Sequence, residues 1–145
     1  MVKILIKKLC KNIKLPIYKT AGSSGMDLVA CIKSKITINP IKTAIIPTGI
    51  AVAIPKNYEI QIRPRSGLAA NKSISVLNTP GTIDSDYRGE IKIILINLSK
   101  KTFVVKLGDR VAQMVICPVV RGKLKEVKNL PKTVRGKGGF GSTGK

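Results

Sequence analysis

Short apolar runs rich in isoleucine and valine recur along this chain, and turn-forming residues lie between them. Pro40, Pro47, Pro80-Gly81 and Gly108-Asp109 are examples of these separators. Short strands that alternate with glycine and proline turns are typical of an all-β sandwich, jelly roll or barrel. The sequence therefore predicts an all-β fold with one helical turn at Ser66–Lys72. The predicted strands are Ile36–Ile38, Ala44–Ile46, Ile50–Ile54, Glu59–Arg63, Ile74–Leu77, Glu90–Asn97, Thr102–Lys106 and Arg110–Ile116.

Length and composition predict one domain with an aliphatic core. The chain has 145 residues, 43% of them hydrophobic, with three Tyr, two Phe and no Trp. Isoleucine, valine and leucine must therefore fill the core. We expect a single β domain over residues 1–134. Residues 135–145 (RGKGGFGSTGK) are rich in glycine, and we expect them to form a flexible tail unless a ligand orders them.

Cysteine usage and hydropathy indicate a cytoplasmic protein. Cys10, Cys31 and Cys117 are scattered without a C-x-x-C pair, and the chain has no histidine. This pattern favours a reducing compartment and argues against zinc. No apolar run approaches the ~18–20 residues that a membrane span needs. The N-terminal segment 1–16 alternates lysine with aliphatic residues, so we interpret it as a strand with a basic face and not as a signal peptide.

The formal net charge of +20 has two interpretations. It can mark a nucleic-acid-binding protein that contacts phosphates. It can also reflect a proteome biased toward lysine, isoleucine and asparagine. The lysines are spread along the chain and aromatic residues for base stacking are few, so we favour the second interpretation and expect nucleic-acid binding to be at most non-specific.

Most of the seven acidic residues lie in short segments next to Gly, Tyr and Arg. Asp27 lies in AGSSGMDLVA, Asp84, Asp86 and Glu90 lie in GTIDSDYRGEIKI, and Asp109 lies in GDRVAQMVI. In so basic a chain, carboxylates in such clusters are candidates for turn formation, pairing with cations or chemistry. The segment Leu77–Ile93 is predicted to form a β-hairpin with Asp84 and Tyr87 at its tip. Asp86 and Glu90 are expected to have a structural role there, as an acidic turn that pairs with nearby Arg88.

Two further segments suit anions. PRSGLA (Pro64–Ala69) offers an arginine, a hydroxyl and exposed amides at a helix start. The tail contains matches to G-x-G-x-x-G (Gly136–Gly141) and to most of a Walker A motif (Gly139–Lys145). Both motifs need a following helix, which the sequence does not supply, so we expect neither. Arg135, Ser142, Thr143 and the glycine amides could still grip phosphate, with Phe140 free to stack on a base.

Taken together, five segments closely resemble, in order and spacing, the five motifs of the trimeric dUTPase family (deoxyuridine 5′-triphosphate nucleotidohydrolases). These segments are AGSSGMDLVA, PRSGLA, GTIDSDYRGEIKI, GDRVAQMVI and RGKGGFGSTG. The resemblance extends from residue 21 to the end of the sequence. It implies a distorted jelly-roll or barrel-like β sandwich that assembles as a homotrimer with shared active sites. It also implies Mg²⁺-dependent hydrolysis of dUTP to dUMP and pyrophosphate, which limits uracil incorporation into DNA and supplies dUMP for thymidylate synthesis.

The resemblance also implies roles for individual residues. Asp84 would be the general base that deprotonates the water attacking the α-phosphorus. Tyr87 would pack against deoxyribose and exclude a 2′-hydroxyl. Asp27 would act on Mg²⁺ indirectly, through its coordinated waters. Asp109 and Arg110 are expected to fix a turn.

The remaining substrate-binding residues implied by the resemblance fall into three groups. Asn78, Thr82, Ile83 and Lys92 would line the uracil slot. Arg65, Ser66, Gly67 and Gln113 would hold the phosphate chain. Arg135, Gly141, Ser142 and Thr143 would close over the substrate, while Phe140 would stack on uracil.

Two alternatives remain. dCTP deaminases resemble this family, but the complete RGKGGFGSTG tail argues against that activity. A nucleotide-sensing or nucleic-acid-binding protein on the same scaffold is the other alternative, and the net charge is its motivation.

Overall fold

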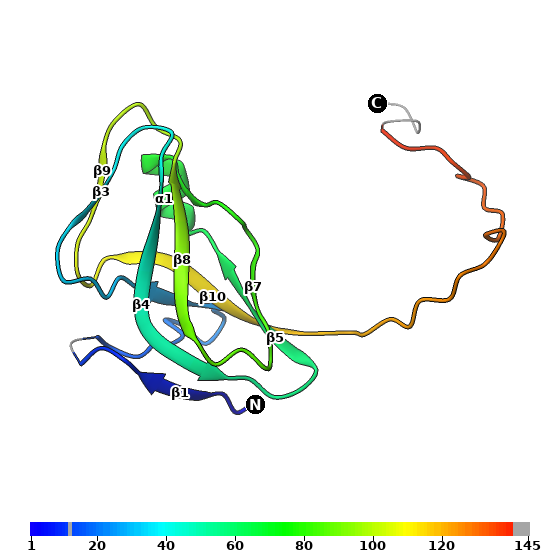
Figure 1. The fold of residues 1–145 in the computed structure, drawn as a ribbon, viewed down its shortest axis with the longest axis horizontal. Helices are drawn as coiled ribbons and strands as arrows, with labels where there is room; N and C mark the ends of the chain where they lie inside the picture. Colours follow the sequence, from blue (N-terminus) through cyan, green and yellow to red (C-terminus); the bar gives the residue numbers. More distant parts are fainter. Residues whose placement is uncertain (12, 141–145) are drawn as a thin grey trace.

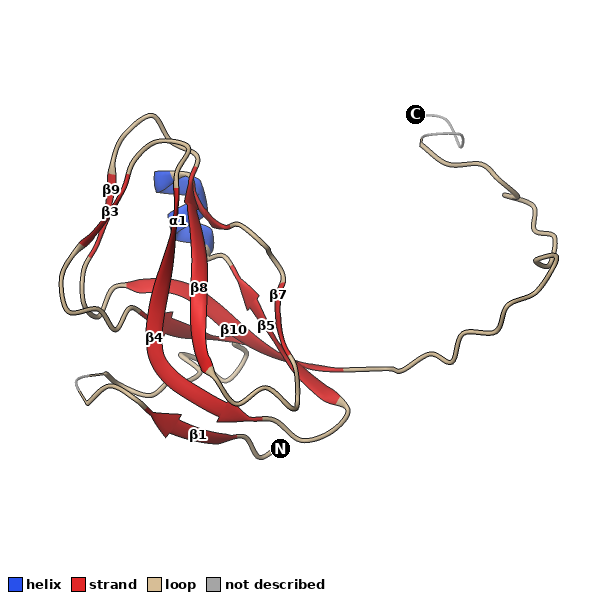
Figure 2. Cartoon of the chain, viewed as in Figure 1, coloured by secondary structure: helices blue, strands red, loops and turns tan. Residues whose placement is uncertain are grey.

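The chain folds as two β-sheets with a short helix and a long C-terminal extension (Figures 1 and 2). The structure is a computed structural model that describes residues 1–11 and 13–140. It confirms the predicted all-β class. The strands are β1 (Leu5–Lys8), β2 (Gly25–Val29), β3 (Ile36–Ile38), β4 (Thr43–Ala53), β5 (Tyr58–Arg63), β6 (Ile74–Val76), β7 (Gly81–Ile83), β8 (Glu90–Asn97), β9 (Phe103–Val105) and β10 (Arg110–Pro118), and the helix is α1 (Ser66–Lys72).

Within the described residues, the strands form two four-stranded sheets and one two-stranded ribbon. One sheet has the order β1-β4-β8-β6, the other has the order β2-β10-β5-β7, and β3 pairs with β9. All pairs are antiparallel. The core contains Ile, Leu, Val, Ala and Met side chains, as the scarcity of aromatic residues predicted.

Strand β8 shows how sequence alternation builds both the core and a functional face. Its burial alternates along the strand, and Ile91, Ile93 and Leu95 are buried. Because neighbouring side chains of a strand point to opposite faces, Glu90 and Lys92 lie on the other face. At the end of the strand, the side chain of Asn97 is fully buried. Its amide nitrogen donates to the carbonyls of Ile38 and Lys101, both at 2.8 Å, and thereby ties the β3–β9 ribbon to the sheet.

The predicted hairpin at Leu77–Ile93 is wrong. Strand β7 pairs with β5, whereas β8 lies between β4 and β6 in the other sheet. Both edges of β8 are therefore already hydrogen-bonded to other strands. The intervening segment, residues 84–89, is also longer than the usual two- to five-residue hairpin loop. It crosses from one sheet to the other instead of closing a hairpin.

Two other strand predictions need correction. Ala44–Ile46 and Ile50–Ile54 belong to one strand, β4, because a bulge and not a turn follows Pro47. Strand β2 was not predicted. The Gly and Ser residues of AGSSGMDLVA leave only a short stretch in which apolar and other residues alternate. The N-terminal strand is confirmed as β1, which pairs antiparallel with β4.

Two of the three cysteines are bonded to each other. A disulfide joins Cys10 to Cys31, across a sequence separation of 21, whereas Cys117 is free. Scattered thiols in a reducing compartment were predicted, so this pairing differs from the expectation. The two cysteines meet because the segment after β1 and the segment after β2 both pack on the bulge of β4. Among the described residues, no helix is long and apolar enough to span a bilayer.

Candidate functional site

A pocket of about 260 Å³ opens where the two sheets meet at the crossing segment 84–89. Its volume lies just below the usual range for ligand sites, about 300–1,000 Å³, so it suits a small ligand or one part of a larger one. The structure brings six predicted site residues to its wall. They are Asn78, Thr82, Ile83, Asp84, Tyr87 and Lys92.

The strand pairing explains why these residues meet. Thr82 pairs with Gln61 of β5, so β7 forms one wall of the pocket from the β2-β10-β5-β7 sheet. Lys92 pairs with Pro47 of β4, so β8 forms the opposite wall from the other sheet. Gly81 allows close packing at the base, because a Cβ there would lie 3.1 Å from the amide nitrogen of Asn78. Each wall of the pocket is thus a strand that is hydrogen-bonded into its own sheet.

Asp84 lies at the rim of this pocket, directly after β7. Its side chain is exposed, and its carbonyl accepts a 3.1 Å hydrogen bond from the amide of Tyr87, which closes the turn. A carboxylate in this position is open to water on one side and to a bound ligand on the other. It can therefore orient a water molecule and accept its proton.

Tyr87 folds back over the crossing segment. Its hydroxyl donates to the carbonyl of Glu90 at 3.0 Å. A Cβ on Gly89 would collide with the Tyr87 hydroxyl and ring, so this arrangement requires a glycine at that position. One wall of the pocket therefore carries an aromatic ring whose hydroxyl is fixed to the main chain of β8.

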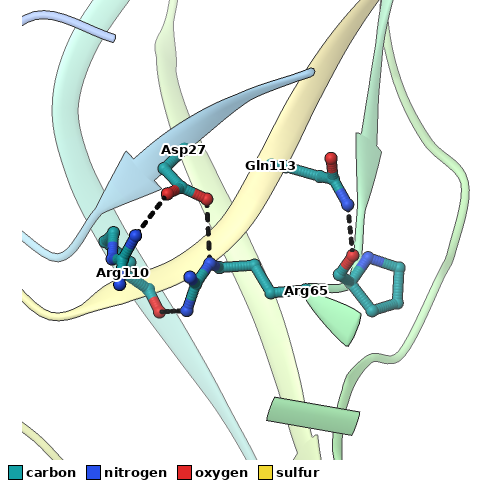
Figure 3. A network of polar contacts seen from close by, with 5 residues as sticks. Asp27, Arg65, Arg110 and Gln113 are labelled. Atoms are coloured by element: carbon teal, nitrogen blue, oxygen red, sulfur yellow. Dashed lines mark hydrogen bonds and ion pairs between the residues drawn. The ribbon is translucent and has the colours of Figure 1, made fainter. Parts of the chain in front are cut away.

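A second polar cluster lies over β2, β10 and the start of α1 (Figure 3). Arg65 Nε donates to Asp27 Oδ1 at 2.8 Å, and Arg110 Nη1 donates to Asp27 Oδ2 at 3.0 Å. The Asp27 side chain is 20% exposed, and two guanidinium groups offset the cost of desolvating its charge. Arg65 also donates to the carbonyl of Arg110 at 3.3 Å.

Gln113 completes this cluster. It pairs with Asp27 on one side and with Arg63 on the other, and its amide donates to the Pro64 carbonyl at 2.9 Å. Gly25 leaves room for this side chain, because a Cβ there would collide with the Gln113 amide oxygen. Ser66 and Gly67 form the first turn of α1 beside the cluster, and no acidic residue lies in that turn. The cluster is suited to an anion.

The pocket and the Asp27 cluster are separate in this single chain. Asp27, Arg65, Arg110 and Gln113 do not line the pocket. The described tail residues Arg135 and Phe140 do not line the pocket. The chain leaves the sheets after β10 and runs away from them (Figure 1), and Arg135 donates from Nε to the Gly138 carbonyl of its own turn at 3.0 Å. Phe140 is fully exposed. The predictions for Gly141, Ser142 and Thr143 lie outside the described residues.

Several predictions about the acidic residues can be compared with the structure. Asp109 fixes a turn as expected, because Oδ2 accepts the amide of Lys106 at 2.8 Å. Arg110 was assigned to the same turn, but its guanidinium contacts Asp27 instead. Arg88 was expected to pair with Asp86 or Glu90, and this is wrong. It donates to the Ser85 and Tyr87 carbonyls, at 2.7 and 2.8 Å, and the Glu90 carboxylate instead accepts the amide of Gly49 at 2.9 Å.

Sequence reasoning therefore missed the contribution of Arg110 to the Asp27 cluster and that of Glu90 to the pocket. No local pattern links Arg110 to Asp27, which is 83 positions away in the chain. The pairing of β2 with β10 is what brings them together. The position of Glu90 directly after Tyr87-Arg-Gly could have indicated that it lies near the pocket. Its contact with β4, however, depends on a bulge that no sequence pattern predicts.

The donor atoms present fit a divalent cation only in an indirect way. Among the described residues, no group of three or more His, Cys, Asp or Glu side chains could hold a metal ion. Both carboxylate oxygens of Asp27 already accept a hydrogen bond from an arginine. Each oxygen retains a lone pair that could accept a hydrogen bond from a metal-bound water. The cluster therefore fits a metal that arrives with its own ligands.

Comparison with known proteins gives a consistent family assignment. The family model described as dUTPase matches residues 11–144. A deoxyuridine 5′-triphosphate nucleotidohydrolase of Hydrogenobaculum sp. is 54% identical, over 99% of both chains. The protein of the same name from Caldanaerobacter subterraneus subsp. tengcongensis is 58% identical, over 92% of this chain and 90% of its own length.

Among solved structures, a mutant dUTPase of Staphylococcus bacteriophage 80alpha with dUpNHpp has a TM-score of 0.88 to this chain. It is 25% identical, and the match covers 98% of each chain. The family match over most of the sequence, the identities above 50% and the shared fold all point to one family. This chain therefore belongs to the dUTPase family.

Proposed function

We propose that this protein hydrolyses dUTP to dUMP and pyrophosphate. Asp84 accepts a proton from a water molecule, whose oxygen attacks the α-phosphorus. The bond from the α-phosphorus to the bridging oxygen breaks, and pyrophosphate leaves with the electron pair. The exposed position of Asp84 at the rim of the pocket supports this role.

The pocket supports a slot for deoxyuridine. Its lining includes Asn78, Thr82, Ile83 and Lys92, and these residues would face the base. Cytosine exchanges a donor and an acceptor on the edge that main-chain groups would contact. Such a mismatch leaves buried polar groups without partners and can cost about 10⁴–10⁵ in specificity. Tyr87 packs against the sugar and leaves no room for a 2′-hydroxyl.

The Asp27 cluster supports triphosphate binding. Arg65, Gln113 and the first turn of α1, with Ser66 and Gly67, offer cations and amides on one surface. Mg²⁺, when bound with the substrate, would neutralise phosphate charge at this surface. Asp27 would accept hydrogen bonds from the water shell, and Arg65 and Arg110 hold the Asp27 carboxylate in place for that role.

A homotrimer with shared sites would explain the separation of the two sites. One nucleotide needs both the base pocket and the phosphate cluster, and a neighbouring copy can bring them together. The extension after β10 could place Arg135, Phe140, Gly141, Ser142 and Thr143 over the site of a neighbour. Closure of the tail over bound substrate would exclude bulk water. The reaction would limit uracil incorporation into DNA and supply dUMP for thymidylate synthesis.

One observation carries this proposal most directly. Five residues of the predicted nucleoside site, Asn78, Thr82, Ile83, Tyr87 and Lys92, line a single pocket whose rim holds Asp84. The test is pyrophosphate release from dUTP with Mg²⁺, in parallel with dTTP, dCTP and UTP. Strong preference for dUTP is the expected result. Equal turnover of all four nucleotides would contradict the pocket assignments, and ammonia release from dCTP would indicate a deaminase instead.

A further inference from the structure

The bulge in β4 lies opposite the start of β8, which contributes Glu90 and Lys92 to the pocket wall. Pro47 pairs with Lys92 and Ala51 pairs with Glu90, so the register between β4 and β8 shifts over residues 48–50. Extra residues in one strand interrupt the ladder of main-chain hydrogen bonds and re-aim nearby side chains. The bulge therefore needs other contacts to hold it against β8.

Two side chains provide these contacts. The hydroxyl of Thr48 donates to the Ile91 carbonyl at 2.6 Å. The amide of Gly49 donates to Glu90 Oε1 at 2.9 Å. The bulge is thus attached to β8 at two adjacent points, one through Thr48 and the other through the carboxylate of Glu90.

The far side of the bulge is held by the disulfide. Gly49 has φ of +69°, and a Cβ there would lie 2.5 Å from Cys10 Cβ and 2.8 Å from Cys31 Cβ. The Gly49 carbonyl accepts the amide of Leu9 at 2.7 Å. Gly49 is therefore enclosed between the disulfide on one side and Glu90 on the other, and its amide is a fixed point for the Glu90 carboxylate.

Glu90 also holds Tyr87 through a different group. Its carbonyl accepts the Tyr87 hydroxyl at 3.0 Å, and both residues line the pocket. The Tyr87 side chain is 43% exposed, so few packing contacts restrain the ring. The hydroxyl contact to Glu90 and the close approach to Gly89 restrain the ring at its outer end.

We propose that Glu90 is a positioning residue that sets selectivity for deoxyribose over ribose. Its carboxylate, anchored on the Gly49 amide, fixes the main chain of β8 at Glu90, and the carbonyl of Glu90 fixes Tyr87 against the sugar. Loss of the anchor lets the start of β8 and Tyr87 move together, and the space for a 2′-hydroxyl opens. The inference rests on the proposed hydrolysis of dUTP. It adds that Glu90 fixes the position of Tyr87, the residue that lies against the sugar.

The test measures kcat/KM for dUTP and for UTP and takes their ratio. The wild-type ratio is measured first, because it tests the proposed function independently of the inference about Glu90. Glu90→Ala removes the acceptor for the Gly49 amide and should lower the ratio by about tenfold to a hundredfold, the effect expected from displacement of a positioning group by about 1 Å. Glu90→Gln retains an acceptor oxygen and should stay within about threefold of wild type.

Two further variants distinguish a positioning role of Glu90 from a general loss of stability around the bulge. Thr48→Val removes the neighbouring attachment of the same bulge and should lower the unfolding temperature while the selectivity ratio stays at the wild-type value. Tyr87→Phe removes the hydroxyl that Glu90 holds, so its combination with Glu90→Ala should be no worse than either single variant.

These outcomes can overturn the inference. An unchanged dUTP:UTP ratio in Glu90→Ala would show a purely structural role. A loss in Glu90→Gln equal to that in Glu90→Ala would show that the charge acts on substrate and that the anchor does not matter. Full additivity with Tyr87→Phe, or an equal fall of the ratio in Thr48→Val, would also contradict the positioning role.

Discussion

Asp84 and Asp86 are two carboxylates on the same crossing segment, with different surroundings. Asp84 lines the nucleoside pocket, whereas Asp86 does not. Both side chains are exposed. Their difference lies in what each can reach. In the proposed reaction, Asp84 is the carboxylate of the two that accepts a proton from a water placed between the rim of the pocket and a bound α-phosphate.

Asp84→Asn should therefore abolish turnover while dUTP still binds. The substitution retains shape and removes the proton acceptor, and general-base catalysis contributes about 10²–10⁴ in rate. Single-turnover kinetics and calorimetric binding of dUTP would measure the two effects separately. Asp86→Asn is the matched control and should keep kcat close to wild type. A normal kcat in Asp84→Asn would exclude Asp84 as the base.

At the scale of elements, the bulge of β4 joins the disulfide to the strand that carries the pocket. Cys31 donates its amide to the Pro47 carbonyl at 2.8 Å, and Leu9 donates to Gly49 at 2.7 Å. These contacts fix the segments after β1 and β2 to the bulge. The disulfide then locks them covalently to each other.

Removal of this disulfide should lower the free energy of unfolding. A disulfide that closes a loop with a sequence separation of 21 lowers the conformational entropy of the unfolded chain. This effect stabilises the folded state by about 3 kcal/mol. Urea unfolding of the oxidised protein, with and without a dithiol reductant, measures the loss. Reduction should have no such effect on the Cys10→Ser/Cys31→Ser double variant, and Cys117→Ser should behave as wild type. Equal stability of oxidised and reduced wild-type protein would contradict a structural role for the bond.

The sequence predicted elements well where the side-chain pattern is local. Strands such as β3 and β8, and helix α1, match their predicted ranges because alternation or a helical turn is encoded within each segment. Strand β7 was assigned to the wrong partner, since pairing with β5 depends on which edges other strands leave free. The Cys10–Cys31 bond was missed for the same reason. It depends on how β1 and β2 meet the bulge of β4.

The candidate site shows the same difference between residues that a local motif identifies and residues that depend on distant partners. Family motifs identified Asn78, Thr82, Tyr87 and Lys92, and the structure places them around one pocket. Arg110 and Glu90 were given other roles, because their partners Asp27 and Gly49 lie far away in sequence. Contacts between neighbouring strands that are far apart in the sequence cannot be read from local spacing.

At the scale of the whole molecule, the separation of the pocket, the Asp27 cluster and the tail predicts sites shared between copies. Asp84→Asn subunits and subunits that lack residues 136–145 should each be inactive as homotrimers. After the two are unfolded and refolded together, activity should return. Random mixing places an intact tail beside an intact Asp84 in roughly a quarter of sites. No recovery, with trimers confirmed by light scattering, would show that each tail serves its own chain.

The net charge of +20 also belongs to this scale. Both ion pairs of the described residues involve arginine and converge on Asp27, so the lysines are left without carboxylate partners there. We expect duplex DNA to bind at low salt and to be released by about 0.2 M salt, as for non-specific attraction to phosphates. Fluorescence anisotropy across a salt series measures this. Tight binding that persists above that concentration would favour a nucleic-acid-binding role instead.

The position of water attack tests the central claim most directly. Hydrolysis of dUTP in water enriched in ¹⁸O, followed by mass spectrometry of both products, shows which phosphorus receives the oxygen. Attack on the α-phosphorus beside Asp84 places one labelled oxygen in dUMP and none in pyrophosphate. Label in pyrophosphate, or products other than dUMP and pyrophosphate, would contradict the account.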